Sequence, residues 1–321
     1  MPRGPLYEDG YSPHLSGHET FPLRYGWLKK AFDAVESTEG RSESNRHVFL
    51  GPHAIAEFGV GRNMVASIRH WATAAGVIKE GSESTQIETT PLGRRLFGKD
   101  GLDPYMEEPT TSWLVHWNIA GNSKKTTWFW AFNHYPAMVF EREGLVQAIN
   151  GLAKEREWPR AAYATIKNDV ACFLRTYVAL PPSGKSNLEE GLESPLTELG
   201  LIRQTGTRER YRFVRGPKPS LGVGAFGYAM TQFWNERFPN TSTLSFEALA
   251  HEPGSPGRVF LLDENELIDR LSSIESATDG AYRWSETAGL KQVIRDAIVD
   301  KEAATRLLAR DYSSAHRRRA A

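Results

Sequence analysis

Residues 51–75 read GPHAIAEFGVGRNMVASIRHWATAA, and this stretch decides the fold. Residues 51–58 predict a short helix, residues 59–61 a tight glycine turn, and residues 62–75 a longer helix, which is the order of a helix-turn-helix. Apolar side chains recur at helical spacing along the second helix, at Met64, Val65, Ile68, Trp71 and Ala72. Its other faces are expected to carry polar side chains, namely Arg62, Asn63, Ser67, Arg69 and His70.

A β-hairpin and a further helix are expected after this motif. Residues 77–78 and 86–89 predict two short strands around a turn that starts at Gly81, and Thr90 and Pro91 begin a helix that runs to Phe97. A helix-turn-helix followed by a hairpin is typical of a winged helix, whose second helix can enter the DNA major groove. Arg62 and Asn63 would then reach base edges, and the hairpin would lie against the backbone. Further candidates for contact with DNA from the same helix are Ser67, Arg69 and His70. Winged helices also serve as protein–protein modules, so DNA binding does not follow from this pattern alone.

The segment before the motif carries the candidate chemistry. Residues 21–35 predict a helix, with Thr20 as its N-cap and Pro22 in its first turn. Just ahead of it, His18 and Glu19 stand side by side, a pair that can act as acid and base or bind a divalent metal. Asp33 on the predicted helix is a candidate further ligand. The competing interpretation is structural, with Glu19 and Thr20 capping the helix.

Composition excludes several classes of protein. The 321 residues carry 39 basic and 39 acidic side chains, so bulk positive charge does not hold this chain to nucleic acid. Hydrophobic residues make up 40%, which is typical of a globular protein, and the length of the chain predicts two or three domains. One cysteine, Cys172, excludes a disulfide framework and any zinc site built from several thiolates. No apolar run approaches the roughly 20 residues of a membrane helix, so we expect a soluble, cytoplasmic protein.

Aromatic and basic residues mark the middle of the chain. Trp113, Trp117, Trp128 and Trp130 flank Lys124 and Lys125, a mixture that can stack exposed bases, although helical spacing favours a core of two helices. Residues 165–178 predict an amphipathic helix, with Cys172 as a packing residue. Residues 201–213 predict a hairpin, so this region is a candidate second winged helix. The hairpin's basic residues, which would contact DNA or simply be solvated, are Arg208, Arg210 and Arg212.

The last hundred residues predict helices and one weak motif. Residues 222–227 match the dinucleotide pattern GxGxxG, but no buried strand precedes them and no βαβ unit surrounds them, so we reject that function. Residues 282–284 are expected to form a strand and residues 286–294 a helix, loosely repeating the first module. The predicted fold is mainly α (α+β), with winged helix-turn-helix modules joined by a helical middle region. The expected domains are residues 1–100, 101–220 and 221–321.

Several motifs in combination resemble one bacterial family. They include residues 16–30 (SGHETFPLRYGWLKK), 58–65 (FGVGRNMV), 215–220 (RGPKPS), 252–259 (EPGSPGRV) and 284–290 (WSETAGL). The family, long catalogued as a domain of unknown function, includes SspB-like DNA nicking components of the single-strand phosphorothioation system, which supports phage defence. The resemblance implies DNA binding and single-strand cleavage with a divalent metal such as magnesium or manganese. It also implies three partner proteins, namely a cysteine desulfurase, an ATPase and an ATP-pyrophosphatase-like sulfur-transfer protein. A homodimer is a further expectation.

The sequence carries no familiar nuclease signature, so the catalytic residues do not follow from the resemblance. Our hypothesis assigns catalysis to His18 and Glu19, with Arg24 near the phosphate and with Glu19 and Asp33 as metal ligands. The rival hypothesis is a non-catalytic winged-helix adaptor that recruits a nuclease or the sulfur-transfer partners. The residues taken by themselves favour this adaptor, since they predict binding modules and no evident active site. A transcription regulator is a third interpretation.

Overall fold

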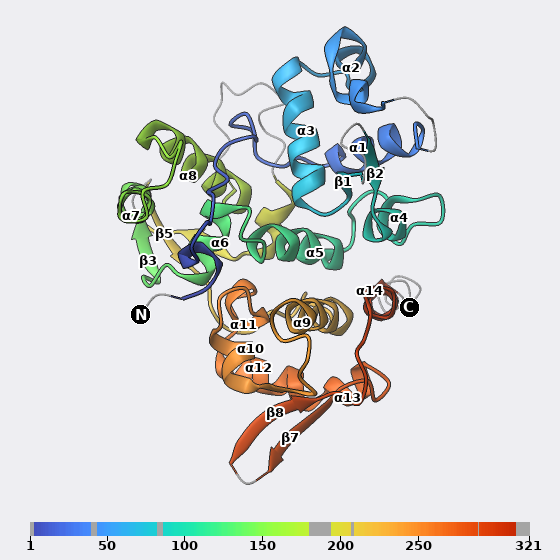
Figure 1. Ribbon diagram of the computed structural model, residues 1–321, viewed down its shortest axis with the longest axis vertical. Helices are drawn as coiled ribbons and strands as arrows, with labels where there is room; N and C mark the ends of the chain where they lie inside the picture. Colours follow the sequence, from blue (N-terminus) through green and yellow to red (C-terminus); the bar gives the residue numbers. More distant parts are fainter. Residues whose placement is uncertain are drawn as a thin grey trace. The chain divides into compact units, whose positions relative to one another are not determined.

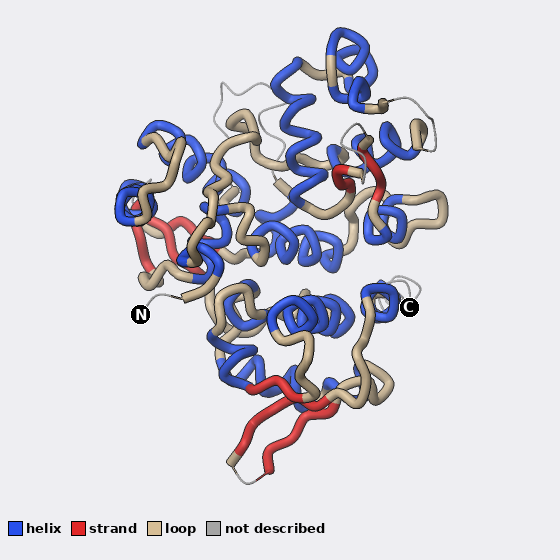
Figure 2. The backbone as a smooth tube through the Cα atoms, in the orientation of Figure 1, coloured by secondary structure: helices blue, strands red, loops and turns tan. Residues whose placement is uncertain are grey.

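The computed structural model describes residues 3–39, 44–81, 86–179, 194–206, 209–287 and 289–312. The chain divides into two compact units, each built from separate segments. Unit 1 comprises Met1–Tyr11, Glu108–Met138 and Phe213–Ala321, and unit 2 comprises Ser12–Glu107 and Val139–Arg212. Both units are mainly helical, with small antiparallel sheets, as the sequence predicted (Figures 1 and 2). The segment expected as a middle domain contributes to both units.

The first half of unit 2 follows the predicted order from residue 51 onward. Its elements are α1 (Trp27–Glu36), η2 (Arg46–Phe49), α2 (Gly51–Phe58), α3 (Arg62–Ala74), β1 (Ile78–Glu80), β2 (Ile87–Thr89) and α4 (Pro91–Phe97). Gly59 makes the turn between α2 and α3 with φ +65°, a backbone conformation that favours glycine. The strands pair antiparallel, with Ile78 opposite Thr89. Thr90 caps α4 by accepting a hydrogen bond from the Gly93 N–H at 2.9 Å. Residues 82–85, the tip of the predicted wing, lie outside the described residues.

Helix α1 begins six residues later than predicted. Its N-cap is Gly26, with φ +77°, and Thr20 and Pro22 belong to the preceding loop. The prediction that Thr20 caps this helix is therefore wrong. The reason is tertiary, because the carbonyls of Thr20 and Phe21 accept hydrogen bonds from side chains of other helices and take no part in a helical ladder.

The second half of unit 2 contains the predicted amphipathic helix and hairpin. Its elements are β3 (Val139–Glu141), α7 (Arg142–Glu155), α8 (Tyr163–Tyr177), η3 (Pro195–Leu199), β4 (Ile202–Gln204) and β5 (Arg210–Phe213). The sheet order is β3-β5-β4, and the short β3 was not predicted. Cys172 is buried on α8, and burial raises the pKa of its thiol, as expected for a packing residue.

Unit 1 buries the tryptophan cluster. Its elements are η1 (Pro5–Tyr7), α5 (Pro109–Ala120), α6 (Thr126–Asn133), α9 (Val223–Arg237), β6 (Thr243–Ser245), α10 (Phe246–His251), α11 (Pro256–Val259), α12 (Glu264–Ser272), α13 (Ile274–Ala277), β7 (Arg283–Thr287), β8 (Leu290–Ile294) and α14 (Lys301–Leu307). All four tryptophans of α5 and α6 are buried, at most 7% exposed. The core interpretation is confirmed, and these rings are not surfaces for stacking bases.

The helix predicted over residues 286–294 is wrong, because residues 286–287 belong to β7 and residues 290–294 form β8. Gly289, with φ +80°, lies in the turn between β7 and β8, whose hairpin extends away from the helices of its unit (Figure 1). Val293 pairs with Leu244 of β6 on one side and Trp284 of β7 on the other. The order β6-β8-β7 matches β3-β5-β4, because in each case a short strand and then helices precede a hairpin whose last strand is central. This internal similarity therefore relates the middle and the C-terminal segments.

The GxGxxG stretch starts helix α9, and no strand leads directly into it, since β5 ends at Phe213. Both oxygens of Asp311 accept hydrogen bonds at 2.8 Å, one from the Gly224 N–H and the other from the Ala225 N–H. A side chain on Gly222 would collide with the same carboxylate, at 2.2 Å. The glycines thus serve internal packing, which supports the rejection of a dinucleotide site. No described helix is long and apolar enough to cross a membrane.

Candidate nucleic-acid interface

The loop of residues 16–21 is anchored by a buried histidine. The His18 side chain is 2% exposed, and its Nε2 lies 2.7 Å from Oδ1 of Asp169 on α8. Its Nδ1 accepts a hydrogen bond from the Thr20 N–H at 3.0 Å. Because a backbone N–H can only donate, Nδ1 is the acceptor, and Nε2 carries the proton that is donated to the carboxylate. The Ser16 N–H donates to the same oxygen at 2.7 Å.

Side chains of α3 and α8 hold the backbone of this loop. Ser67 donates to the His18 carbonyl at 3.0 Å, and the Trp71 indole donates to the Phe21 carbonyl at 3.0 Å. From α8, Arg175 donates to the Thr20 carbonyl, and the Cys172 thiol donates to Phe21 at 3.3 Å. Ser67 is fully buried in this contact, so the prediction that it lies on an exposed, DNA-contacting face is wrong.

The loop exposes Glu19 in a strained conformation. Ser16, Glu19 and Thr20 have positive φ values of 68°, 47° and 66°. Each such non-glycine residue costs about 1–3 kcal/mol, and these conformations cluster at functional sites. Glu19 is exposed, whereas both ring nitrogens of His18 are engaged in the interior. The two side chains of the predicted acid–base pair therefore lie apart in environment, with His18 engaged in the interior as a positioning residue and Glu19 exposed.

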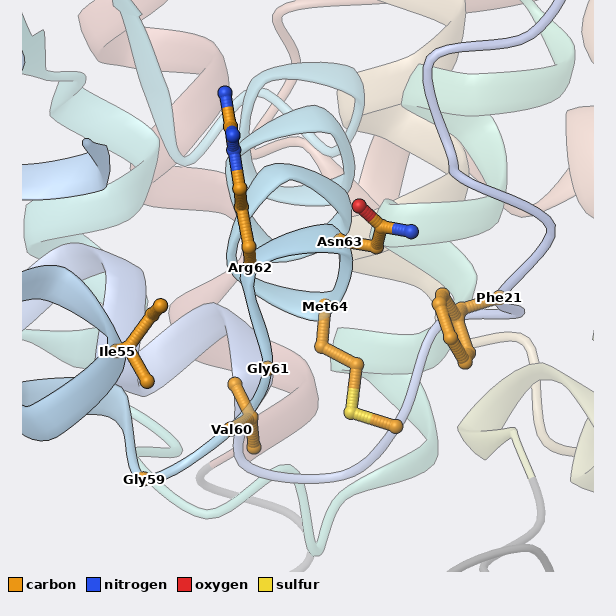
Figure 3. A pocket seen from close by; sticks show the side chains of 8 residues that line it. All are labelled: Phe21, Ile55, Gly59, Val60, Gly61, Arg62, Asn63 and Met64. Carbon is orange, nitrogen blue, oxygen red and sulfur yellow. The ribbon is translucent and has the colours of Figure 1, made fainter. Parts of the chain in front are cut away.

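Two hollows flank the start of α3. Hollow 1, of about 640 Å³, is lined by Phe21, Ile55, Gly59, Val60, Gly61, Arg62, Asn63 and Met64 (Figure 3). Hollow 2, of about 400 Å³, is lined by Glu19, Phe49, Leu50, Gly51, Ala54, Ile55, Arg62, Asn63, Val65 and Ala66. Ile55, Arg62 and Asn63 belong to both. The sequence motif that starts α3 and the strained loop thus meet at one place.

Arg62 and Asn63 are available to a ligand. Both are exposed, and within the described part of the chain neither side chain has a hydrogen-bond or ionic partner. Arg69, further along α3, donates to Glu80 at 2.6 Å, and Arg46 donates to the other oxygen of Glu80 at 2.9 Å. Partial burial alone would raise the pKa of Glu80, but the two arginines together lower it. The charge of Arg69 is therefore compensated, and that of Arg62 is not.

Two other predicted residues have structural contacts. His70 packs edge-on against Trp71, with ring centroids 5.3 Å apart, and lies against Gly17. Arg24 is half-buried, with its guanidinium 5.8 Å from the ring centre of Phe21 and 5.6 Å from that of Trp27. Neither His70 nor Arg24 lines a hollow.

The remaining basic candidates lie elsewhere. Lys124 is exposed and Lys125 half-buried, and both precede α6 in unit 1. Arg210 and Arg212 are exposed on β5 of unit 2, opposite Glu141 and Val139 of β3. Arg208 lies outside the described residues.

The predicted metal ligands do not form a cluster. Asp33 is ion-paired with Lys29 on α1 and does not line hollow 2, so the structure does not bring it to Glu19. Over the described ranges, no three His, Cys, Asp or Glu side chains gather in a way that could hold a metal ion.

Sequence reasoning missed Asp169, the residue that anchors the loop. A signal was present, because Asp169 lies three residues after Ile166 and four before Phe173, within the apolar stripe of the predicted helix. An acidic residue in such a stripe needs a buried partner. Which partner it has depends on the tertiary fold.

The chain is similar to known proteins over most of its length. Residues 15–312 match a family model described as a protein of unknown function, DUF4007. Two solved structures are similar, a crystal structure of SspB and one of magnesium ion-bound SspB, with TM-scores of 0.80 and 0.79. In both cases the identity is 30%, and the match covers 94% of this chain and 89% of the other. No curated protein matches the chain.

Proposed function

The chain belongs to the DUF4007 family, and on that premise we propose that it is a DNA-binding, metal-dependent nicking endonuclease of the SspB type. Its role would lie in DNA phosphorothioate modification and phage defence, together with sulfur-transfer partners. The observation that carries the proposal is the convergence of Glu19, Arg62 and Asn63 on hollow 2.

The start of α3 suits a phosphate group. The first N–H groups of a helix have no partner within the helix, and the helix dipole adds positive potential there. No side chain caps α3, whose N-cap is Gly61. Arg62 adds a full charge beside these N–H groups, so a DNA phosphate would meet several donors at once. The order α2, turn, α3, hairpin also fits a winged helix with α3 as the recognition helix.

Glu19 would supply the carboxylate for cleavage. Mg²⁺ commonly binds proteins through one or two carboxylates and completes its shell with waters and substrate phosphates. The exposed carboxylate of Glu19, next to the proposed phosphate site at the start of α3, would suit this mode of Mg²⁺ binding. A bound ion would stabilise negative charge on the phosphate during attack. The chain's own contribution would be to hold the phosphate at Arg62 and to orient or deprotonate a water molecule at Glu19.

A non-catalytic adaptor is the second candidate. The burial of His18 and the lack of a three-ligand metal cluster among the described residues favour it. Such an adaptor would use the same interface at α3 and leave cleavage or sulfur transfer to a partner protein.

Supercoiled plasmid distinguishes the two candidates. The purified protein is incubated with Mg²⁺, Mn²⁺ or chelator, and open-circle product and DNA affinity are both measured. A nickase should form open circles that chelator abolishes and that Glu19→Gln reduces by about 100-fold, the scale of general base catalysis. Arg62→Ala should weaken binding and reduce the salt slope by about 1.

Two variants serve as matched controls. Glu36→Gln and Arg95→Ala remove exposed charges of the same kinds from the ends of α1 and α4, outside both hollows, and should change neither nicking nor binding. Unaltered nicking by folded Glu19→Gln would overturn the role of Glu19. Binding that depends on Arg62, without nicking under any metal, would favour the adaptor. Absence of DNA binding would overturn both candidates.

A further inference from the structure

We propose that hollow 1 receives one unstacked nucleobase, so that the preferred DNA contains an unpaired or extruded nucleotide beside the bound phosphate. This inference rests on the proposed DNA binding at α3 and specifies the form of DNA that the site takes.

The walls of hollow 1 suit a flat aromatic ligand. Phe21, Ile55, Val60 and Met64 line it, and Figure 3 shows the Met64 side chain extending toward the Phe21 ring. Ile55 is 40% exposed although it is aliphatic. An aromatic ring stacks on any base, and a thioether packs favourably against aromatic edges. The volume of about 640 Å³ lies within the usual range for small-ligand sites, which is about 300–1,000 Å³.

The stacking residue is held in place before any ligand arrives. The Phe21 N–H donates to the His18 carbonyl at 2.8 Å, and the Phe21 carbonyl accepts from Trp71 at 3.0 Å. The Cys172 thiol donates to the same carbonyl at 3.3 Å. Because these bonds already order the backbone at Phe21, stacking of a base costs no further ordering of the loop. The anchored loop therefore presents a preformed aromatic surface.

Polar groups at the rim match a nucleotide. Asn63 offers an amide donor and acceptor side by side, the pair that can recognise a base edge. Arg62 belongs to both hollows and can hold the phosphate of the same nucleotide. Neither side chain is engaged elsewhere in the described chain. An apolar stacking wall with an amide and a free guanidinium at its edge fits a nucleotide better than a wholly apolar ligand.

A glycine at the rim allows the hollow to be closed without strain. Gly61 has φ −64° and ψ 159°, a conformation that any residue adopts, and a Cβ there would meet nothing within 4 Å. Gly61→Phe should fill hollow 1, whereas Gly61→Ala leaves space and adds no side-chain acceptor that would occupy the first N–H groups of α3. The two variants form a matched pair that differs in the occupancy of the hollow.

The experiment compares three DNA probes of one sequence: a fully paired duplex, the same duplex with a single-nucleotide bulge, and the single strand. The parent protein should bind the bulged probe about tenfold or more tightly than the paired one, on the scale of base–aromatic stacking. Gly61→Ala should keep this preference, and Gly61→Phe should lose it. With 5-iododeoxyuridine as the bulged nucleotide, photocrosslinks should fall on Phe21 or Met64.

The outcomes distinguish failure of the nucleobase site from failure of the proposed DNA binding at α3. Equal affinity for paired and bulged probes, or crosslinks confined to residues outside hollow 1, would overturn the nucleobase site and leave DNA binding at α3 standing. A preference for the bulge that survives Gly61→Phe in a folded protein would also overturn it. Failure to bind any of the three probes would overturn the proposed function and this inference together.

Discussion

The imidazole of His18 and the carboxylate of Asp169 are 151 residues apart in the chain and lie 2.7 Å apart in the interior. Both side chains are only 2% exposed. The contact fixes the loop that carries Glu19 and Phe21, so one buried hydrogen bond positions residues of both hollows. Removal of this hydrogen bond should lower both the stability of the protein and its affinity for DNA.

Asp169→Ala should destabilise unit 2 by about 2–4 kcal/mol, because it leaves the buried His18 Nε2–H without an acceptor and also removes the acceptor of the Ser16 N–H. Urea unfolding followed by tryptophan fluorescence measures the loss. Asp169→Asn keeps an oxygen that can accept both bonds and should lose clearly less. Equal losses for the two variants would show that the carboxylate oxygen is not what holds the loop.

Gly17→Ala should also disrupt the loop. A Cβ at Gly17 would lie 2.6 Å from the His70 Nδ1, and φ there is +86°. Gly26→Ala is the matched control, since its φ is +77° and its Cβ would meet nothing within 4 Å. Gly26→Ala should cost only the backbone strain of about 1–2 kcal/mol, and Gly17→Ala should cost about 1 kcal/mol more. Thermal unfolding of both variants provides the comparison, which a larger loss for Gly26→Ala would contradict.

Gly224→Ala should loosen α14 from α9. The new methyl carbon would lie 2.4 Å from the Leu307 carbonyl oxygen and 3.0 Å from a carboxylate oxygen of Asp311. We expect a loss of about 1–3 kcal/mol and faster amide exchange across residues 301–307. Gly151→Ala on α7 meets nothing within 4 Å and should stabilise the protein by up to about 1 kcal/mol. Unchanged exchange in Gly224→Ala would show that this close approach is not required.

Stability should fall in mild acid because of His116. Burial lowers the pKa of this fully buried ring from 6.5 to about 3, while its Nε2 donates to the Val259 carbonyl at 2.8 Å. As pH falls below 6.5, the His116 imidazole is protonated in the unfolded chain but stays neutral in the folded protein. The free energy of unfolding therefore drops by about 1.4 kcal/mol per pH unit. Between pH 6.5 and 5 this amounts to about 2 kcal/mol.

Urea unfolding at pH 7, 6 and 5 tests this dependence. His116→Gln should have a shallower slope than the parent protein, whatever its absolute stability. His53→Gln, a change at an exposed histidine, is the matched control and should keep the parent slope. Parallel slopes for the parent protein and His116→Gln would rule out His116 as the source of the acid sensitivity.

The sequence by itself determined the elements whose signals are local. The two helices and glycine turn of residues 51–74, the cap of α4 at Thr90 and the amphipathic helix α8 all follow from periodicity and turn residues within a few positions. The buried tryptophans follow from helical spacing in the same way. These features need no knowledge of distant segments, because each helix closes its own backbone hydrogen bonds.

Only the tertiary structure decided the loop, the C-terminal hairpin and the two hollows. Residues 16–21 are not part of helix α1, because side chains of α3 and α8 donate hydrogen bonds to the carbonyls of His18, Thr20 and Phe21. Residues 290–294 form a strand because β6 and β7 satisfy their backbone from both sides. Backbone groups bond to whichever partner the fold brings near, and partners so far apart in the chain leave no periodic signal in the sequence. For that reason the sequence indicated His18 and Glu19 as a pair, and the fold buried one and exposed the other.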